Sequence, residues 1–173
     1  MAQTSFDLTK VHQANLKMLK EIDRICRKYK LQYALDSGTL LGAVRHGGFI
    51  PWDDDADVMM TRSNYEKFAK VARRELPEGM SFVEPNEYHG GKAFYDFVSR
   101  VTYDKSQKFE ESKKMAFYDD KISRLCVDIF VTDALPAGPV SKRLTKLCHC
   151  IVYGLALGHR YGLSLSDYKG MMK

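Results

Sequence analysis

Residues 35–68 read LDSGTLLGAVRHGGFIPWDDDADVMMTRSNYEKF, in which a glycine-containing turn is followed by a dense group of aspartates. A short strand is predicted over residues 32–35 and a small apolar helix over residues 40–44, with a turn around Gly38 between them. This order of strand, tight turn and helix start leaves free backbone N–H groups, which can hold phosphate. The segment therefore predicts an α/β fold with an anion-binding turn.

Four of the five residues at positions 53–57 are aspartates. Asp55 and Asp57 alternate with apolar residues as on a strand, so their carboxylates are expected to share one face, and Asp53 extends the row. Closely packed carboxylates raise one another's pKa, and a hard divalent cation, Mg²⁺ or Mn²⁺, relieves this repulsion. A solvated acidic turn is the alternative for any single aspartate. A calcium loop of the EF-hand type is excluded because its glycine and its bidentate glutamate are absent.

The strongest strand prediction covers residues 125–131, which read LCVDIFV and are apolar except at Asp128. An acid inside such a strand costs several kcal/mol unless a partner compensates it, so Asp128 requires a partner. Arg100 belongs to a strand predicted over residues 100–103. Its side chain is expected to be solvated, and the alternative is that it reaches the same site as Asp128.

The rest of the chain predicts helices that flank a small sheet. Apolar residues recur at helical spacing over residues 8–29, and a capping box at Ser63 and Glu66 opens a helix over residues 63–74. The remaining predictions are strands over residues 80–83, 93–98 and 100–103, a loop over residues 104–114 and a last helix over residues 139–158. Together they predict an α/β fold, a small mixed sheet flanked by helices, as one domain over residues 1–173.

Composition and charge restrict the function. The chain has 173 residues, of which 45% are hydrophobic, enough for one ordinary core. Its net charge of +5 resides in residues 141–173, so no basic face for nucleic acid is indicated. The four cysteines show no metal-site spacing and are expected to be reduced thiols. No membrane span or signal peptide is recognisable, so a cytoplasmic location is expected.

The segment from Leu35 to Phe68 closely resembles the signature of the LicD family, and VDIFVTDALP at residues 127–136 looks like that family's second motif. LicD proteins are related to nucleotidyltransferase-fold enzymes and to fukutin-type transferases. The resemblance, over about residues 11–136, implies a nucleotidyltransferase-like fold. It also implies a transferase that moves a phosphorylated alcohol such as phosphocholine from a CDP-activated donor to a sugar hydroxyl. The acceptor would be a cell-surface glycan or a teichoic acid or lipopolysaccharide precursor, including lipid-linked saccharides.

The same resemblance implies roles for the aspartates. Asp55 and Asp57 would bind the metal and act in catalysis, with Asp53 as a further ligand. Asp128 would be the third catalytic carboxylate, contributed by a neighbouring strand. Two roles stay open for it: it takes the proton of the acceptor hydroxyl, or it completes the metal shell.

Other residues of the first motif are candidates for binding the donor. By resemblance, Gly38 and Thr39 would hold its phosphates. Arg45 and His46, at the end of the short helix, are candidates for the same role through charge-assisted hydrogen bonds. The alternatives are an ion pair with the aspartates for Arg45 and a simple turn position for His46. Trp52, the only tryptophan, is expected in the core, with stacking on cytosine as the alternative.

Two other functions stay open: a nucleotidyltransferase that moves the nucleotide itself, and a degenerate domain that binds a nucleotide or a partner protein. Family members generally run well past residue 173, so the chain is expected to be a short variant or a fragment lacking the family's C-terminal part. Its basic last helix includes a mostly apolar run over residues 147–157 and is expected to pack in the core. The alternative is peripheral contact with the inner face of the membrane, next to lipid-linked acceptors.

Overall fold

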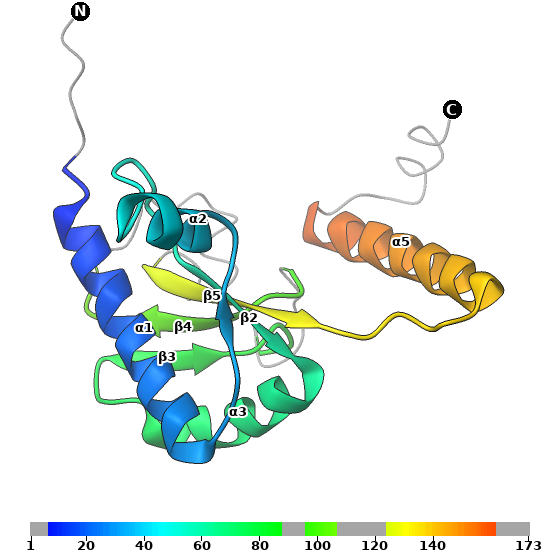
Figure 1. Cartoon of the computed structure of the whole chain (residues 1–173). Helices are drawn as coiled ribbons and strands as arrows, with labels where there is room; N and C mark the ends of the chain where they lie inside the picture. Colours follow the sequence, from blue (N-terminus) through cyan, green and yellow to red (C-terminus); the bar gives the residue numbers. More distant parts are fainter. Residues whose placement is uncertain (1–6, 88–95, 107–123, 162–173) are drawn as a thin grey trace, which may run out of the picture. The chain divides into compact units, whose positions relative to one another are not determined.

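The computed structural model describes residues 7–87, 96–106 and 124–161 (Figure 1). The chain forms two compact units. One contains residues up to 84 and residues 98–132, and the other contains residues 85–97 and the chain from residue 133 onward. The candidate site residues named above all fall in the first unit. The expectation of a single domain over residues 1–173 stays a prediction.

A mixed five-stranded sheet organises the first unit (Figure 1). Its order is β1-β2-β5-β4-β3, in which β2 and β5 are parallel and the other neighbours are antiparallel. The strands of the two aspartate motifs, β2 and β5, therefore lie side by side in the interior of the sheet, and the α/β prediction is confirmed. The strands are β1 (Ala34–Leu35), β2 (Asp57–Thr61), β3 (Met80–Val83), β4 (Ser99–Tyr103) and β5 (Cys126–Thr132).

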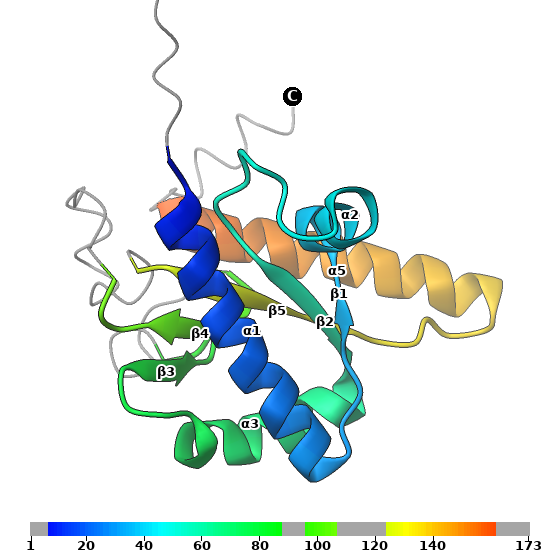
Figure 2. The same cartoon turned by 60° about the vertical axis from the view of Figure 1, so that its left-hand side comes forward.

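Two long helices, α1 (Thr9–Tyr29) and α3 (Arg62–Glu75), pack on one face of this sheet, and Figure 2 shows α1 crossing that face. Because side chains alternate along a strand, one set of strand residues points toward these helices and the other set away from them. Burial of the first set supplies the main stabilising contribution of the fold. The core includes Met18, Ile22 and Ile25 of α1, Phe68 and Ala72 of α3, and Val58, Met60, Val101, Val127 and Ile129 of the sheet.

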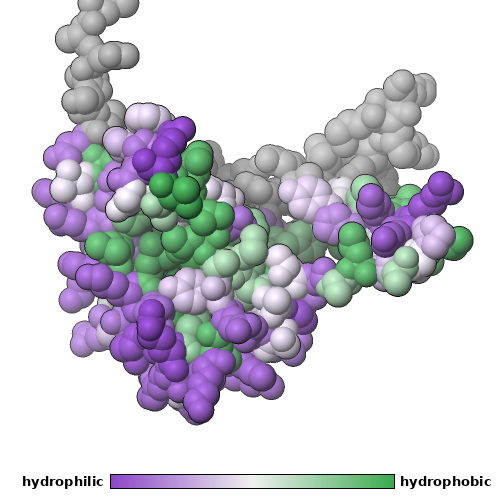
Figure 3. Space-filling model, viewed as in Figure 1, coloured by the Kyte–Doolittle hydropathy of each residue, from purple (hydrophilic) through white to green (hydrophobic). Residues whose placement is uncertain are grey.

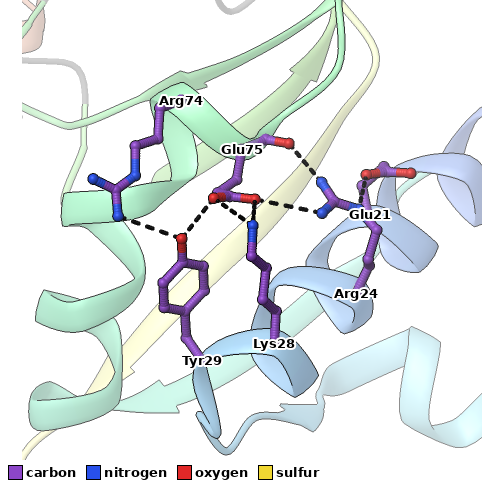
Figure 4. A network of polar contacts seen from close by, with 6 residues as sticks. All are labelled: Glu21, Arg24, Lys28, Tyr29, Arg74 and Glu75. Atoms are coloured by element: carbon purple, nitrogen blue, oxygen red, sulfur yellow. Dashed lines mark hydrogen bonds and ion pairs between the residues drawn. The ribbon is translucent and has the colours of Figure 1, made fainter.

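A polar network joins the C-terminal ends of α1 and α3 (Figure 4). The Glu75 carboxylate accepts hydrogen bonds from Lys28 Nζ at 2.8 and 2.9 Å and from the Tyr29 hydroxyl at 2.5 Å. Arg24 Nη2 donates to the backbone carbonyl of Glu75 at 2.5 Å. The bonds from Lys28 and Tyr29 lower the pKa of Glu75 to about 2. Such surface contacts add little stability singly, but here several of them connect the same ends of the two helices.

The start of α3 differs from the sequence prediction. The helix begins at Arg62 with Thr61 as its N-cap residue, so the predicted capping box at Ser63 is wrong. Thr61 is the last residue of β2 and keeps an extended backbone, which is the conformation that an N-cap residue needs. Asn64 Nδ2 donates to Thr61 Oγ1 at 2.8 Å. The end of the strand therefore decides where the helix begins.

Two further boundaries also differ. The helix after the glycine turn, α2, spans Ser37–His46 and is longer than predicted at both ends. β4 begins at Ser99, and residues 96–98, the described part of the strand predicted over residues 93–98, are not in a strand. The remainder of that prediction, and most of the loop predicted over residues 104–114, lie outside the described residues.

In its described residues, the second unit contains the long helix α5 (Pro139–Tyr161). Apolar side chains that are 53–78% exposed recur along it at steps of three and four residues, and they are Val140, Leu144, Leu147, Ile151 and Leu155. The expected core packing of this helix stays a prediction. In the same ranges, no helix is both long enough and apolar enough to span a bilayer.

Candidate functional site

The parallel pairing of β2 and β5 brings the two aspartate motifs together. Asp57 on β2 lies in register with Asp128 on β5, and Arg100 on β4 lies in register with Asp128 from the other side. Residues in register on neighbouring strands point to the same face of a sheet. The three side chains therefore form a row, here called the polar row, on the face opposite α1 and α3.

Arg100 is the partner that Asp128 requires. Its Nε lies 3.0 Å from Asp128 Oδ1, and its Nη2 donates to Oδ2 at 3.4 Å. Arg100 is only 7% exposed, while the Asp128 side chain is 25% exposed. The expectation that Asp128 is paired is confirmed. The expectation that Arg100 is solvated is wrong, because contact with both oxygens of a carboxylate compensates the guanidinium for the water it loses.

Asp55 and Asp57 have raised pKa values. Partial burial, followed by the hydrogen bond and charge of Asp53, raises the pKa of Asp55 from 3.8 to about 6. Burial also raises the pKa of Asp57 to about 6, with smaller contributions from the charges of Asp55 and Asp128. The carboxylates are thus near enough to repel one another. Asp57 is the first residue of β2, so Asp53 and Asp55 precede the strand rather than belong to it.

The glycine turn is attached to the start of β2. Thr39 is 5% exposed, and its Oγ1 accepts a hydrogen bond from the Asp57 backbone N–H at 2.8 Å. Asp36 N–H donates to the backbone carbonyl of Asp57 at 3.0 Å. Ser37 has φ 46°, a left-handed conformation that costs energy for a residue with a Cβ. Its side chain hydrogen-bonds to Asp57 and partly offsets the increase in the Asp57 pKa. The turn therefore positions Asp57.

Gly38 lies directly against Asp53. A Cβ at this position would overlap Asp53 Oδ2, so glycine leaves room for that carboxylate. Because Oδ2 is the end of a flexible side chain, a larger residue at position 38 would displace the Asp53 carboxylate rather than the backbone. The role of Gly38 and Thr39 in holding phosphate stays a prediction.

Arg45, His46 and Trp52 are all exposed. The expectation that Trp52 lies in the core is wrong: it is 73% exposed, whereas its neighbour Ile50 is buried. The His46 and Trp52 rings meet edge to face, with centroids 6.2 Å apart. Within the described ranges Arg45 makes no ion pair with the aspartates, so the alternative proposed for it is not found there.

Comparison with known proteins agrees with this arrangement. The family described as LicD/FKTN/FKRP, nucleotidyltransferase domain, matches residues 30–133. The chain belongs to this family. The match covers more than half of the chain and contains every candidate residue from Gly38 to Asp128, so the resemblance of the two motifs to LicD proteins is confirmed.

Individual relatives in the LicD family match to different extents. The lipopolysaccharide cholinephosphotransferase LicD of Haemophilus influenzae is 32% identical over 145 residues, which are 84% of this chain and 48% of that protein. An uncharacterized protein of Rickettsia typhi is 38% identical over 55 residues, or 32% of this chain and 18% of that protein. One of Rickettsia prowazekii is 48% identical over 42 residues, or 24% of this chain and 16% of that protein. The chain thus spans about half the length of the first relative and less of the others.

The donors in this LicD-family domain suit a hard cation. In the part of the chain that the structure describes, no three His, Cys, Asp or Glu side chains form a ready-made metal cage. Mg²⁺ does not require one, because it is usually held by one or two carboxylates together with substrate phosphates. Asp55 and Asp57 fit this mode of binding, since a cation would relieve the repulsion that raises their pKa values. Asp128 is less available because Arg100 contacts both of its oxygens.

Sequence reasoning missed parts of this site. Ser37 is an ordinary turn residue in the sequence, and no local pattern predicts its left-handed backbone or its bond to Asp57. Arg100 did carry a signal, because an acid on an apolar strand requires a cation from elsewhere. The expectation of reduced cysteines stays a prediction. Cys126 lies next to Asp128 on β5, where burial and the charge of Asp128 raise its thiol pKa to about 12.

Proposed function

We propose that this chain provides the catalytic part of a metal-dependent phosphotransferase. It would move a phospho-alcohol such as phosphocholine from a CDP-activated donor to a sugar hydroxyl of lipopolysaccharide, or of a related glycan such as a teichoic acid precursor. The supporting observation is the register of Asp57 with Asp128 in a domain of the LicD family, in which one relative is a lipopolysaccharide cholinephosphotransferase. The chain spans about half of that relative. We therefore propose the acceptor only as a sugar hydroxyl of a glycan of this class, without naming the particular sugar.

Asp55 and Asp57 are the proposed ligands of Mg²⁺ or Mn²⁺, with Asp53 as a third. When bound, such a cation neutralises the diphosphate of the donor and the charge that develops on the departing CMP. The protein's own contribution is to hold these carboxylates in place. The Thr39 hydroxyl accepts a hydrogen bond from the backbone N–H of Asp57 and so fixes that backbone. Gly38 leaves the space that the Asp53 carboxylate occupies.

Asp128 is proposed to accept the proton of the attacking hydroxyl. Arg100 contacts both of its oxygens and therefore orients the carboxylate, as a general base requires. The other role that stays open for Asp128, that of a metal ligand, predicts a different effect on the affinity for Mn²⁺. If Asp128 is the base, Asp128→Asn abolishes transfer but leaves Mn²⁺ affinity within about twofold. If it is a ligand, affinity falls about 10–100-fold.

The donor's phosphates are proposed to meet the turn at Gly38 and Thr39 and the side chains of Arg45 and His46. The two side chains are exposed at the last turn of α2, where solvent and an anion can reach them. Charge-assisted hydrogen bonds of this kind are among the stronger polar contacts in proteins. Arg45→Gln is therefore expected to raise the Kd of the donor without changing the unfolding temperature of the free protein.

The first test is donor binding, because it needs no acceptor. Thermal unfolding is measured with and without Mn²⁺ against CDP-choline, CDP-ribitol, CDP-glycerol and UDP-sugars. A ligand that binds only the native state raises its stability by mass action. We expect a Mn²⁺-dependent rise with one CDP-alcohol that is absent in Asp55→Asn/Asp57→Asn and retained in Glu66→Gln, an exposed carboxylate on α3. No rise with any CDP-alcohol would contradict the proposal.

Product identity separates this reaction from the nearest alternative. Transfer of the phospho-alcohol releases CMP, whereas transfer of a nucleotide from a nucleoside triphosphate releases pyrophosphate. Incubation with CDP-choline and lipopolysaccharide, followed by ion-exchange chromatography, is expected to show CMP.

We also propose peripheral contact of α5 with an anionic membrane. Its exposed apolar residues are accompanied by Lys142, Arg143 and Lys146, and the sequence of the helix contains no acidic residue. Flotation with phosphatidylglycerol vesicles is expected to carry the protein upward, and Lys142→Glu/Lys146→Glu is expected to prevent this. Equal flotation of both proteins would refute the contact.

A further inference from the structure

Helix α1 contacts the loop between α2 and β2, residues 47–56, which we call the acidic loop. His12 Nε2 donates to the backbone carbonyl of Asp53 at 2.7 Å, since a carbonyl oxygen can only accept. Asn15 Nδ2 donates to the backbone carbonyl of Asp54 at 3.2 Å. Two successive carbonyls of the loop are thus held by side chains one helical turn apart on α1.

The His12 ring makes a second contact with the same loop. It stacks on Phe49, with ring centroids 4.9 Å apart and planes inclined by 13°. One side chain therefore holds the loop at two points, by its ring at Phe49 and by its N–H at Asp53. Holding two points four residues apart restricts the segment between them, which contains Trp52.

Asn15 gives the stronger evidence for a role in holding the acidic loop, because it interrupts the apolar stripe of α1. It is completely buried and lies in helical register with Met18, Ile22 and Ile25 of the core. Among the described residues its Oδ1 has no hydrogen-bond partner. A buried polar atom without a partner destabilises the folded state, so packing alone favours an apolar residue here. Compared with an apolar residue, asparagine at this position gains one hydrogen bond, which its amide donates to the Asp54 carbonyl.

The opposite side of the acidic loop lies against two glycines of α2. A Cβ at Gly38 would overlap the Asp53 carboxylate, and a Cβ at Gly42 would lie 2.6 Å from Gly48 O and 2.9 Å from Ile50 N. The loop therefore approaches α2 without intervening side chains, and α1 supplies the polar contacts on the other side. Contacts from two helices therefore hold this loop, although Trp52, Asp54 and Asp55 remain exposed to solvent.

We infer that His12 and Asn15 are positioning residues that order the acidic loop before any ligand binds. By fixing the carbonyls of Asp53 and Asp54, they keep the carboxylates of Asp53 and Asp55 close to Asp57. Both residues lie outside the part of the chain matched by the family, residues 30–133. The inference that these two residues order the acidic loop does not depend on the proposed function. The expected effect on cation affinity does rest on that function.

Trp52 provides a direct readout, because it is the only tryptophan and lies in the acidic loop. Its fluorescence anisotropy and acrylamide quenching are measured in EDTA-treated protein, beside the unfolding temperature. His12→Phe keeps a stacking ring but removes the N–H donor, and Asn15→Asp keeps the shape but places an acceptor against the carbonyl. His12→Gln retains a donor of similar reach. Gln13→Ala, an exposed residue of the same helical turn, is the matched control.

We expect His12→Phe and Asn15→Asp to lower the anisotropy of Trp52, because a released loop lets its ring move faster; acrylamide quenching should change little, since Trp52 is already 73% exposed. His12→Gln is expected to restore much of the wild-type anisotropy, and Gln13→Ala to equal wild type. The unfolding temperature shows whether a change in Trp52 is local or reflects general unfolding. His12 is partly exposed near the start of α1, so His12→Phe is expected to fold even if Asn15→Asp does not.

The second measurement is the Kd of Mn²⁺, determined by electron paramagnetic resonance of the free ion. Loss of residues that orient metal ligands typically weakens binding about 10–100-fold, and we expect this range for His12→Phe and Asn15→Asp. Wild-type Trp52 anisotropy in a folded His12→Phe variant would overturn the ordering role. Altered Trp52 anisotropy with unchanged Mn²⁺ affinity would overturn the link to the ligands. If wild-type protein binds no Mn²⁺, the proposed metal role fails, whereas the Trp52 measurement still decides the ordering role.

Discussion

Replacing Asp57 by asparagine is expected to stabilise the metal-free protein while abolishing its proposed reaction. Asp57 is 9% exposed and its pKa is raised from 3.8 to about 6, first by burial and then by the charges of Asp55 and Asp128. At neutral pH the folded protein therefore holds a carboxylate in a position that favours the protonated form. Asparagine resembles that protonated form in shape and lacks the charge, and its oxygen can still accept the bond from Ser37.

The size of the effect follows from the change in pKa. A difference of about two units corresponds to at most about 3 kcal/mol, at roughly 1.4 kcal/mol per unit. Screening by solvent reduces this value, so we expect about 1–2 kcal/mol. For a protein of this size such a gain raises the unfolding temperature by about 2–8 °C.

The effect depends on pH in a definite direction. Because the folded pKa of Asp57 is raised, its protonation favours the folded state fully below pH 3.8, and this contribution is lost as the pH rises through about 6. The wild type and Asp57→Asn should therefore be equally stable near pH 4, and the variant should be more stable above pH 7. Thermal unfolding followed by circular dichroism in EDTA at pH 4.5, 5.5, 6.5 and 7.5 measures this difference.

Glu66→Gln is the matched control, because this exposed carboxylate should show no such dependence. The reasoning is refuted if Asp57→Asn is less stable than wild type at pH 7.5 without metal. It is also refuted if the difference between the two proteins does not change with pH.

Three further predictions concern other parts of the first unit. Arg100→Met leaves Asp128 without its cation in a partly buried position, and urea unfolding should show a loss of about 2–4 kcal/mol, which Arg100→Lys should reduce. The lowered pKa of Glu75 contributes stability that is present above pH 4.5 and is lost as the pH falls through about 2. Glu75→Gln should therefore be less stable than wild type at pH 6 and equally stable near pH 2, as measured by circular dichroism. Phe68→Ala removes a fully buried ring that meets Phe82 edge to face, and chemical unfolding should show a loss of about 3–5 kcal/mol with little change in the polar row.

The surface of the first unit also carries apolar residues outside the polar row. Figure 3 shows apolar surface beside α1 and α2, where Leu16, Leu40, Leu41 and Val44 are exposed. A cleft of about 140 Å³ in this region is lined mainly by apolar side chains, including Leu16, Leu35 and Phe49. Thr39, one of the residues proposed to hold the donor's phosphates, also lines this cleft, so the apolar surface borders the proposed phosphate site.

Several features of the site could be predicted from neighbouring residues alone. The spacing of Asp55 and Asp57, the glycine turn before them and the apolar strand around Asp128 are local patterns, and each appears in the structure with modest shifts in its boundaries. The same patterns carried the resemblance to the LicD family, which the comparison confirms. The prediction that Trp52 is buried was wrong because side-chain size indicates only a tendency, and the path of the acidic loop leaves this ring 73% exposed.

The sequence by itself determined which groups are available: a cluster of aspartates, an isolated acid on an apolar strand and a turn that positions a helix. Only the tertiary structure decided which groups meet. Arg100 pairs with a carboxylate 28 residues away, and His12 binds a carbonyl 41 residues away. These contacts depend on strand register and on the placement of α1 across the sheet. Both are set by burial of the whole core, to which residues throughout the first unit contribute together, so no short segment of the chain encodes them.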